Sequence, residues 1–95
     1  MREIRVCRQH GTTLKRALKG AERIAEEMGE EFSLTHEWED HTLHFHRTGV
    51  TGHIKVDKKE IEVYVKLGFL LMALGPRIEH EINRFCDEKF GPATK

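Results

Sequence analysis

Three histidines are spaced so that they could act as metal ligands. His44 and His46 stand two residues apart on a predicted strand, and His53 takes the same face of the next predicted strand. Three neutral imidazoles form a ligand set that zinc or another divalent ion accepts. The alternation places no acidic residue to complete such a site, and exposed histidines are common on open sheets. We therefore expect a polar outer face and no cofactor, with a metal site at these three histidines as the alternative.

Two arginines and a histidine form a second candidate, an anion or polar site. Arg8 and Arg47 each continue the inward-facing positions of a predicted strand. A charge is costly there unless it reaches an acidic partner or the end of the strand. Together with His10 they could bind an anion at one end of the sheet. Pairing of both arginines with Asp or Glu at the rim of the sheet is the more frequent arrangement, and we expect it here.

Residues that often act in catalysis are present, but none has the neighbours that catalysis requires. The alternation puts His36 beside Leu34 and Trp38 on the buried face, which favours a hydrogen-bonded structural histidine over a catalytic acid or base. Cys7 lies on a strand with no cation or helix N-terminus predicted beside it to activate a thiol. Ser33 is the only serine, and no serine, histidine and aspartate arrangement follows from the sequence. We predict that the protein is not an enzyme.

The segment from Phe69 to Leu74 is apolar on all sides, and we select it as the binding surface. At 100° per residue, Leu71 and Leu74 would face the sheet. The other side chains would point away or lie on the flanks, and they form the predicted docking or dimer patch: Phe69, Leu70, Met72 and Ala73. An exposed apolar turn requires a cover, such as a second subunit, a partner or a hydrophobic surface. The alternative is that this turn closes the open end of the sheet.

The strands that position these residues follow from the alternation of apolar side chains. Period-two patterns predict strands at 2–8, 33–38, 42–47, 50–56 and 61–67. The last four follow one another as a meander, because turn residues separate them: Glu39-Asp40, Thr48-Gly49 and Asp57-Lys58-Lys59.

Apolar residues at helical spacing predict a helix over 14–32, after an N-cap at Thr12 or Thr13. Gly20 lies inside this helix. A glycine there costs about 1 kcal/mol relative to alanine, unless close packing against the sheet uses the space of the missing side chain.

A second helix is predicted from about Gly68 to Gly91-Pro92. Gly75-Pro76 interrupts its apolar stripe, because proline lacks a backbone donor and crowds the preceding turn. We expect either a kink there or a short first turn, with Pro76 opening the main helix.

The order β-α-β-β-β-β-α predicts an α+β fold in which both helices pack on one face of a curved antiparallel sheet. Domains like that of the TATA-binding protein use the same order, and a reduced helix-grip fold is similar. The 95 residues suffice for a single hydrophobic core. We therefore predict one domain over 1–91 and a short tail over 92–95.

Composition limits the partners that the chain can have. The 16 basic and 16 acidic residues cancel, so the net field that would attract nucleic acid is absent, and we expect no nucleic-acid partner. The two cysteines match neither a zinc ribbon nor a disulfide framework, which indicates reduced thiols. The longest apolar run is too short to span a membrane, and no leader pattern precedes it. We expect a cytoplasmic protein without a membrane span.

Several blocks together carry a family resemblance over nearly the whole chain: IRVCRQH (4–10), Trp38, TLHF (42–45), RTGV (47–50), LGFLL (67–71) and IEHEI (78–82). With them the chain resembles the polyhydroxyalkanoic acid system proteins, a family named for a bacterial gene neighbourhood concerned with polyester storage granules. Gln9 is a departure, since the family has a proline between the arginine and the histidine. The resemblance implies a small granule-associated accessory protein, and it carries over no catalytic residue.

We therefore expect a non-catalytic accessory protein of polyhydroxyalkanoate storage-granule metabolism. It would dock to the granule surface or to a granule-associated protein through the apolar start of the second helix, and a homodimer through the same patch is a further expectation. One alternative function is a carrier that holds a small apolar ligand between the sheet and the helices. Another is a metal-binding module at the three histidines.

Overall fold

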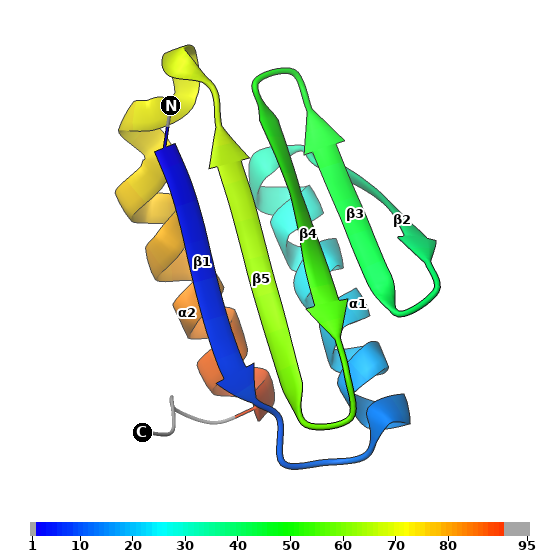
Figure 1. Ribbon diagram of the computed structural model, residues 1–95. Coiled ribbons are helices and arrows are strands. Elements are labelled where there is room, and N and C mark those ends of the chain that lie inside the picture. Colours follow the sequence, from blue (N-terminus) through cyan, green and yellow to red (C-terminus); the bar gives the residue numbers. More distant parts are fainter. Residues whose placement is uncertain (1, 91–95) are drawn as a thin grey trace.

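Five antiparallel strands form one open sheet in the computed structural model, with the order β1-β5-β4-β3-β2 (Figure 1). The structure describes residues 2–90, apart from the side chains of Arg2 and Leu70. The strands are β1 (Arg2–Gln9), β2 (Thr35–Glu39), β3 (Thr42–Arg47), β4 (Val50–Val56) and β5 (Glu60–Leu67). The predicted meander is confirmed, and β1 pairs with β5 at its far side.

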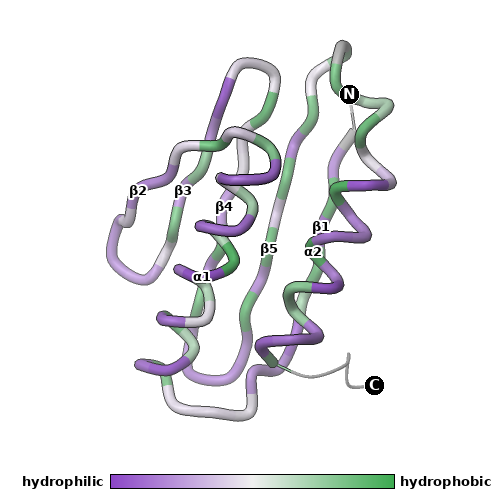
Figure 2. The backbone as a smooth tube through the Cα atoms, turned by 180° about the vertical axis from the view of Figure 1, so that it is seen from behind, coloured by the Kyte–Doolittle hydropathy of each residue, from purple (hydrophilic) through white to green (hydrophobic). Residues whose placement is uncertain are grey.

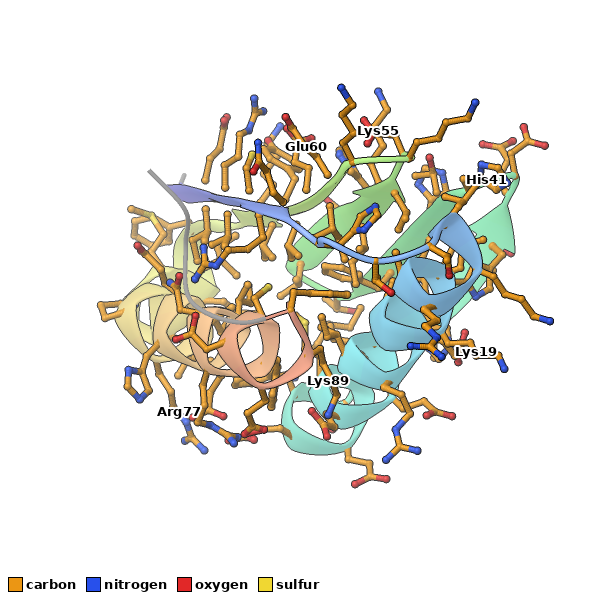
Figure 3. The ribbon with its side chains drawn as sticks, turned by 90° about the horizontal axis from the view of Figure 1, so that it is seen from below. Lys19, His41, Lys55, Glu60, Arg77 and Lys89 are labelled. Carbon is orange, nitrogen blue, oxygen red and sulfur yellow. The ribbon has the colours of Figure 1, made fainter. Side chains whose placement is uncertain are left out.

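Two α-helices lie side by side over one face of the sheet, so the α+β class and the two-layer arrangement are confirmed (Figure 2). They are α1 (Leu14–Phe32) and α2 (Gly75–Phe90), and a 3-10 helix, η1 (Phe69–Leu74), joins β5 to α2. Seen end-on, Lys55 and Glu60 extend from the sheet face opposite the helices (Figure 3). The predicted ending at Gly91-Pro92 and the tail at 92–95 lie outside the described residues.

Small side chains let α1 lie close to the sheet. Ala17, Ala21 and Ala25 are buried along its inner side, beside the larger Ile24 and Met28. The predicted N-cap is confirmed at Thr13, whose Oγ1 accepts a hydrogen bond of 3.2 Å from the Arg16 amide. The helix ends where Ser33 adopts a left-handed conformation, with φ of 59°.

At Gly75-Pro76 the structure has a short first turn followed by a new helix, which is the second of the two predicted forms. The 3-10 helix η1 ends at Leu74, and Pro76 is the second residue of α2, where its missing amide hydrogen costs no helical bond. Pro76 therefore does not kink a continuous helix but lies in the first turn of a new one.

The space left by Gly20 is used, although by the other helix rather than by the sheet. A Cβ atom at Gly20 would lie 2.7 Å from the ring of Phe90, which is half-buried against the core at the end of α2. The glycine therefore allows α1 and α2 to approach each other at this point.

Gly52 in β4 allows an aromatic ring to lie across the strand. It is the direct cross-strand partner of Phe45, and a Cβ atom at Gly52 would lie 2.6 Å from that ring and 2.2 Å from the carbonyl oxygen of Tyr64. Phe45 is one of the largest fully buried side chains, so its position helps to define the core.

Replacing Gly52 with alanine should therefore destabilise the fold by about 1–3 kcal/mol, because the methyl group overlaps the Phe45 ring and the neighbouring strand. Urea unfolding followed by circular dichroism measures this difference. Thr51→Ala, at the exposed neighbouring position of β4, is the control and should change stability little. Equal stability of Gly52→Ala and wild type would contradict the packing described above.

Candidate functional site

The predicted apolar patch lies at the end of the sheet where β5 turns into η1. A 3-10 helix turns by about 120° per residue, so side chains three apart lie on one line. Leu71 and Leu74 share one such line, and Phe69 and Met72 share another. The 3-10 helix therefore places Phe69 and Met72 on one line, which the predicted α-helical spacing does not.

Exposure within this segment follows the 3-10 geometry only in part. Phe69 is 83% exposed, Ala73 is also exposed, and Met72 is half-buried. Leu71 packs against the core as predicted, whereas Leu74 is 37% exposed and only partly faces inward. The Leu70 side chain lies outside the described part. We define the η1 patch as Phe69, Met72, Ala73 and Leu74.

The backbone around the η1 patch is fixed to the β3–β4 turn. The Gly68 amide donates a hydrogen bond of 2.8 Å to the carbonyl of Gly49, and the Leu71 amide donates to the carbonyl of Gly68 at 3.0 Å. Gly49 has φ of 86°, and the Leu71 side chain lies against it where a Cβ atom would otherwise be. The patch is therefore presented from a supported segment and not from an isolated loop.

The space between the helices and the sheet beneath this patch is small. A cavity of about 20 Å³ is lined by apolar groups of α1, the sheet, η1 and α2, among them Met28, Val65, Leu71 and Ile78. A cavity of this size has room for about one water molecule, so it is too small for a ligand of several carbon atoms. A ligand carrier would require the two layers to separate.

Arg8 pairs with acidic and amide groups of α2, as the pairing hypothesis predicts. Its guanidinium donates to Asn83 Oδ1 at 2.8 Å and to Asp87 Oδ1 at 3.1 Å, while the side chain is 8% exposed. Its Nε is buried without a hydrogen-bond partner among the described residues. Arg8 therefore connects β1 to the last turns of α2.

His10 holds the β1–α1 connection against the β4–β5 turn. Its Nδ1 accepts a hydrogen bond of 3.2 Å from the Thr12 amide, so the hydrogen is on Nε2, which donates to the carbonyl of Asp57 at 2.8 Å. The ring is buried and lies 6.5 Å from the ring of Phe90, centroid to centroid. Both ring nitrogens are thus used within the fold.

Arg47 lies at the opposite end of the sheet from Arg8 and His10. Arg8 is paired with Ile61 at the start of β5, whereas Arg47 ends β3 and is paired with Val50. Arg47 donates a hydrogen bond of 2.8 Å to the carbonyl of Phe32, at the C-terminal end of α1, and not to an Asp or Glu. The three residues of the candidate anion site therefore do not lie together, because antiparallel pairing separates the two strand ends, and the expected pairing with Asp or Glu holds for Arg8 but not for Arg47.

Two of the three candidate metal ligands face each other on the outer face of the sheet. His44 and His53 are directly opposite across β3 and β4, with ring centroids 6.4 Å apart. Each Nε2 lies 3.4 Å from a different carboxylate, Glu39 for His44 and Glu62 for His53. The two imidazoles therefore have separate acidic partners.

His46 shares the outer face but lies two residues further along β3. It is opposite Thr51 in β4, and its Nδ1 lies 3.5 Å from Thr35 Oγ1 in β2. Across residues 2–90, no group of three or more His, Cys, Asp or Glu side chains is placed to hold a metal ion. The structure therefore brings His44 and His53 together but places His46 apart from them.

The outer face carries instead a row of ring contacts across the strands. His53 stacks on Tyr64 of β5 at 5.2 Å, and the Arg5 guanidinium of β1 lies 5.1 Å from the centre of the Tyr64 ring. Burial and the neighbouring Glu3 carboxylate raise the pKa of Tyr64. These contacts stabilise cross-strand pairs on the solvent side of the sheet.

His36 is held by a carboxylate of α1, in agreement with the structural interpretation. Its Nε2 lies 2.9 Å from Glu22 Oε2, and Trp38 Nε1 donates to Glu22 Oε1 at 2.6 Å. Trp38 was predicted to be buried, but it is 37% exposed because β2 is the edge strand of the sheet. Burial opposes ionisation of Glu22, yet the hydrogen bonds from Trp38 and His36 outweigh it and lower the pKa of that carboxyl.

The two cysteines lie in different environments. Cys7 is exposed on the outer face, where partial burial and the carboxylates of Glu62 and Glu60 raise the pKa of its thiol. Cys86 is buried in α2, and burial raises the pKa of its thiol to about 11. Neither environment favours the thiolate form that nucleophilic catalysis requires.

Two residues of these sites, Glu22 and Leu74, do not follow from the sequence. Glu22 was not singled out because spacing within α1 does not reveal which strand packs beside it. Leu74 was assigned to the core on α-helical geometry, and Gly75-Pro76 was the only local signal that the first turn is separate.

Within residues 2–90, the helices are too short or too polar to span a membrane.

A comparison with protein families matches residues 4–90 to the family described as Putative polyhydroxyalkanoic acid system protein. Comparisons with curated proteins and with solved structures found no match.

The lowered pKa of Glu22 predicts a dependence of stability on pH. Because this pKa is lower in the folded than in the unfolded protein, the ionised carboxylate stabilises the fold above the unfolded value of about 4.3, and this contribution is lost as the pH falls through the folded value. Glu22→Gln should therefore be less stable than wild type near neutral pH, and the difference should shrink below about pH 4. Urea unfolding at a series of pH values measures it, and a difference that does not change with pH contradicts the assignment.

A thiol reagent should distinguish the two cysteines. In the folded protein Cys7 should be labelled while Cys86 is labelled only after unfolding, because Cys86 is buried and its pKa is about 11. Glu62→Gln should speed the labelling of Cys7, since a carboxylate that raises the thiol pKa is removed. Mass spectrometry of the labelled peptides gives both rates. Labelling of both cysteines at the same rate would show that α2 does not bury Cys86.

Proposed function

Because the chain belongs to the polyhydroxyalkanoic acid system protein family, we propose that it is a non-catalytic accessory protein of polyhydroxyalkanoate storage-granule metabolism. It docks to the granule surface, or to a protein on that surface, through the η1 patch. An intracellular location at or near granules is part of the proposal.

The exposure of Phe69 is the observation that carries this proposal. A phenylalanine that is 83% exposed loses the hydrophobic free energy that burial would supply, and two apolar neighbours, Leu74 and Ala73, are also exposed. Covering a large apolar side chain contributes about 1.5–3 kcal/mol. Contact of Phe69 and Leu74 with an apolar surface would therefore supply enough free energy for weak, reversible docking.

The support beneath the patch favours docking of a preformed surface. The Gly68–Gly49 hydrogen bond and the Leu71 side chain hold η1 against the β3–β4 turn. A segment whose backbone is already fixed loses little backbone freedom when its side chains are covered. A polyester surface and a shallow apolar pocket on a granule protein both suit such a patch.

The non-catalytic part of the proposal is supported by how the reactive side chains are engaged. His10 uses both ring nitrogens in hydrogen bonds of the fold, and His36 is held by Glu22. The pKa values of both cysteine thiols are raised. The element order also supports a fold of the TATA-binding-protein-like or reduced helix-grip kind as part of this proposal.

Removing the aromatic ring of Phe69 should weaken the dock without changing the fold. We expect Phe69→Gln to bind amorphous polyhydroxyalkanoate particles roughly 10- to 100-fold more weakly than wild type, which corresponds to the loss of one covered apolar side chain. Co-sedimentation with washed particles, and with particles that keep their native protein coat, measures this and distinguishes polymer from protein partners.

Phe69→Leu is the matched control, because it keeps an apolar side chain at the same exposed position and should retain most of the binding. Circular dichroism should show that both variants fold as wild type does. If wild type and Phe69→Gln sediment equally with both kinds of particle, the η1 patch is not the docking surface. If wild type stays in solution with both, the docking proposal is wrong.

A further inference from the structure

The outward face of α1 carries its charges separated by sign along the helix. In its first half the exposed charged side chains are basic, Lys15, Arg16, Lys19 and Arg23, while Glu22 is partly buried beside β2. Its second half presents acidic side chains: Glu26, Glu30 and Glu31. Figure 3 shows Lys19 extending outward from α1, on the side away from α2. The face opposite the buried stripe is thus basic at one end and acidic at the other.

This arrangement is unfavourable for the helix by itself. Basic groups lie at the N-terminal end of the helix dipole and acidic groups at its C-terminal end, the reverse of what the dipole favours. Like charges also recur four residues apart, as in Lys15 with Lys19 and in Glu26 with Glu30. Local helix stability therefore does not account for the pattern.

Contacts with the rest of the fold do not account for it either. Among the described residues, the ion pairs of α1 involve Glu22, Glu27 and Glu31, which lie next to β2 or α2. The exposed charges at the centre of the face have no ion-pair partner there: Lys15, Arg16, Lys19, Arg23, Glu26 and Glu30. In contrast, α2 neutralises its own surface, where Arg84 bridges Glu81 and Glu88.

The spacing of these charges is self-complementary. In an antiparallel pair of α1 helices related by a two-fold axis between residues 22 and 23, Lys15 faces Glu30 of the other copy and Lys19 faces Glu26. Each of these pairs occurs twice, because the axis exchanges the two copies. Arg23 faces Glu22 next to the axis. The same face thus supplies both the basic and the acidic half of the contact.

We propose that α1 is a self-association surface, through which two copies of this chain pair antiparallel along their outward faces. The partner is a second copy of this chain, since an antiparallel copy places an acidic side chain opposite each paired basic one at the same spacing. The contact is formed by exposed ion pairs, so the dimer is weak and sensitive to salt. None of its residues belongs to the η1 patch, so this proposal and the docking proposal can fail independently.

Charge reversal tests the pairing in the full chain. In Lys15→Glu/Lys19→Glu the paired positions 15/30 and 19/26 are all acidic, and in Glu26→Lys/Glu30→Lys they are all basic. Sedimentation velocity at about 20 mM and about 500 mM salt measures association. We expect wild type to dimerise at the lower salt concentration, with a Kd at least roughly tenfold higher for either double variant and at high salt.

An equimolar mixture of the two double variants provides the decisive measurement. Each face then meets its opposite, so the mixture should associate at low salt although neither variant does so alone. The control is Lys58→Glu/Lys59→Glu in the β4–β5 turn, which makes the same change in net charge as Lys15→Glu/Lys19→Glu outside the paired positions of α1 and should associate as wild type does. Circular dichroism should show that every variant is folded, since reversal at Lys15 and Lys19 also improves the match to the helix dipole.

Three outcomes would overturn the proposal. The first is a monomeric wild type at low salt over the full range of protein concentration. The second is a mixture of the two variants that stays monomeric. The third is a Lys58→Glu/Lys59→Glu control that loses association as completely as the α1 variants do, which would assign the effect to net charge.

Discussion

Burial of a single face of the sheet under two helices is the constraint on which the other features depend. It explains why apolar and polar residues alternate along β5, where Ile61, Val63, Val65 and Leu67 are buried and the residues between them are not. Small residues follow at the points of closest approach, such as Ala21 in α1 and Gly52 in β4. Because one layer of helices covers one face, every other surface of the molecule is left to polar groups, with the η1 patch as the main exception.

Periodicity was sufficient to predict the strands and α1, and it narrowed the N-cap to Thr12 or Thr13, because each depends on residues close together in sequence. The misplaced sites depend on pairing between distant segments. Arg8 and Arg47 were grouped because both face inward, but β1 lies beside β5 and their two ends are far apart. The η1 segment differs for another reason, since six apolar residues in a row fit a 3-10 and an α-helix equally well, and only the 3-10 form brings Phe69 and Met72 onto one line.

The exposed surfaces differ in whether oppositely charged side chains lie next to one another. On the outer sheet face, oppositely charged residues are cross-strand neighbours, as with Glu3 and Lys66 or Lys55 and Glu62. On α2, Arg84 is paired within the helix. Only on α1 are the signs kept apart along a solvent-facing stripe of the described surface. The described part of the chain therefore has two uncovered surfaces. The η1 patch has exposed apolar side chains, and the α1 face has charged side chains without ion pairs.

The pairing of β1 with β5 also governs how the molecule comes apart. Arg2 lies opposite Leu67 and Gln9 opposite Glu60, so α1 and three strands must be arranged before this ladder can close. Closing so long a loop carries an entropic cost that local hairpins do not, so the β2–β5 meander gains its contacts earlier than β1 does. Arg8 couples β1 to α2 through Asn83 and Asp87. These two elements should therefore open together as one unit in native-state hydrogen exchange, while amides of the meander remain protected.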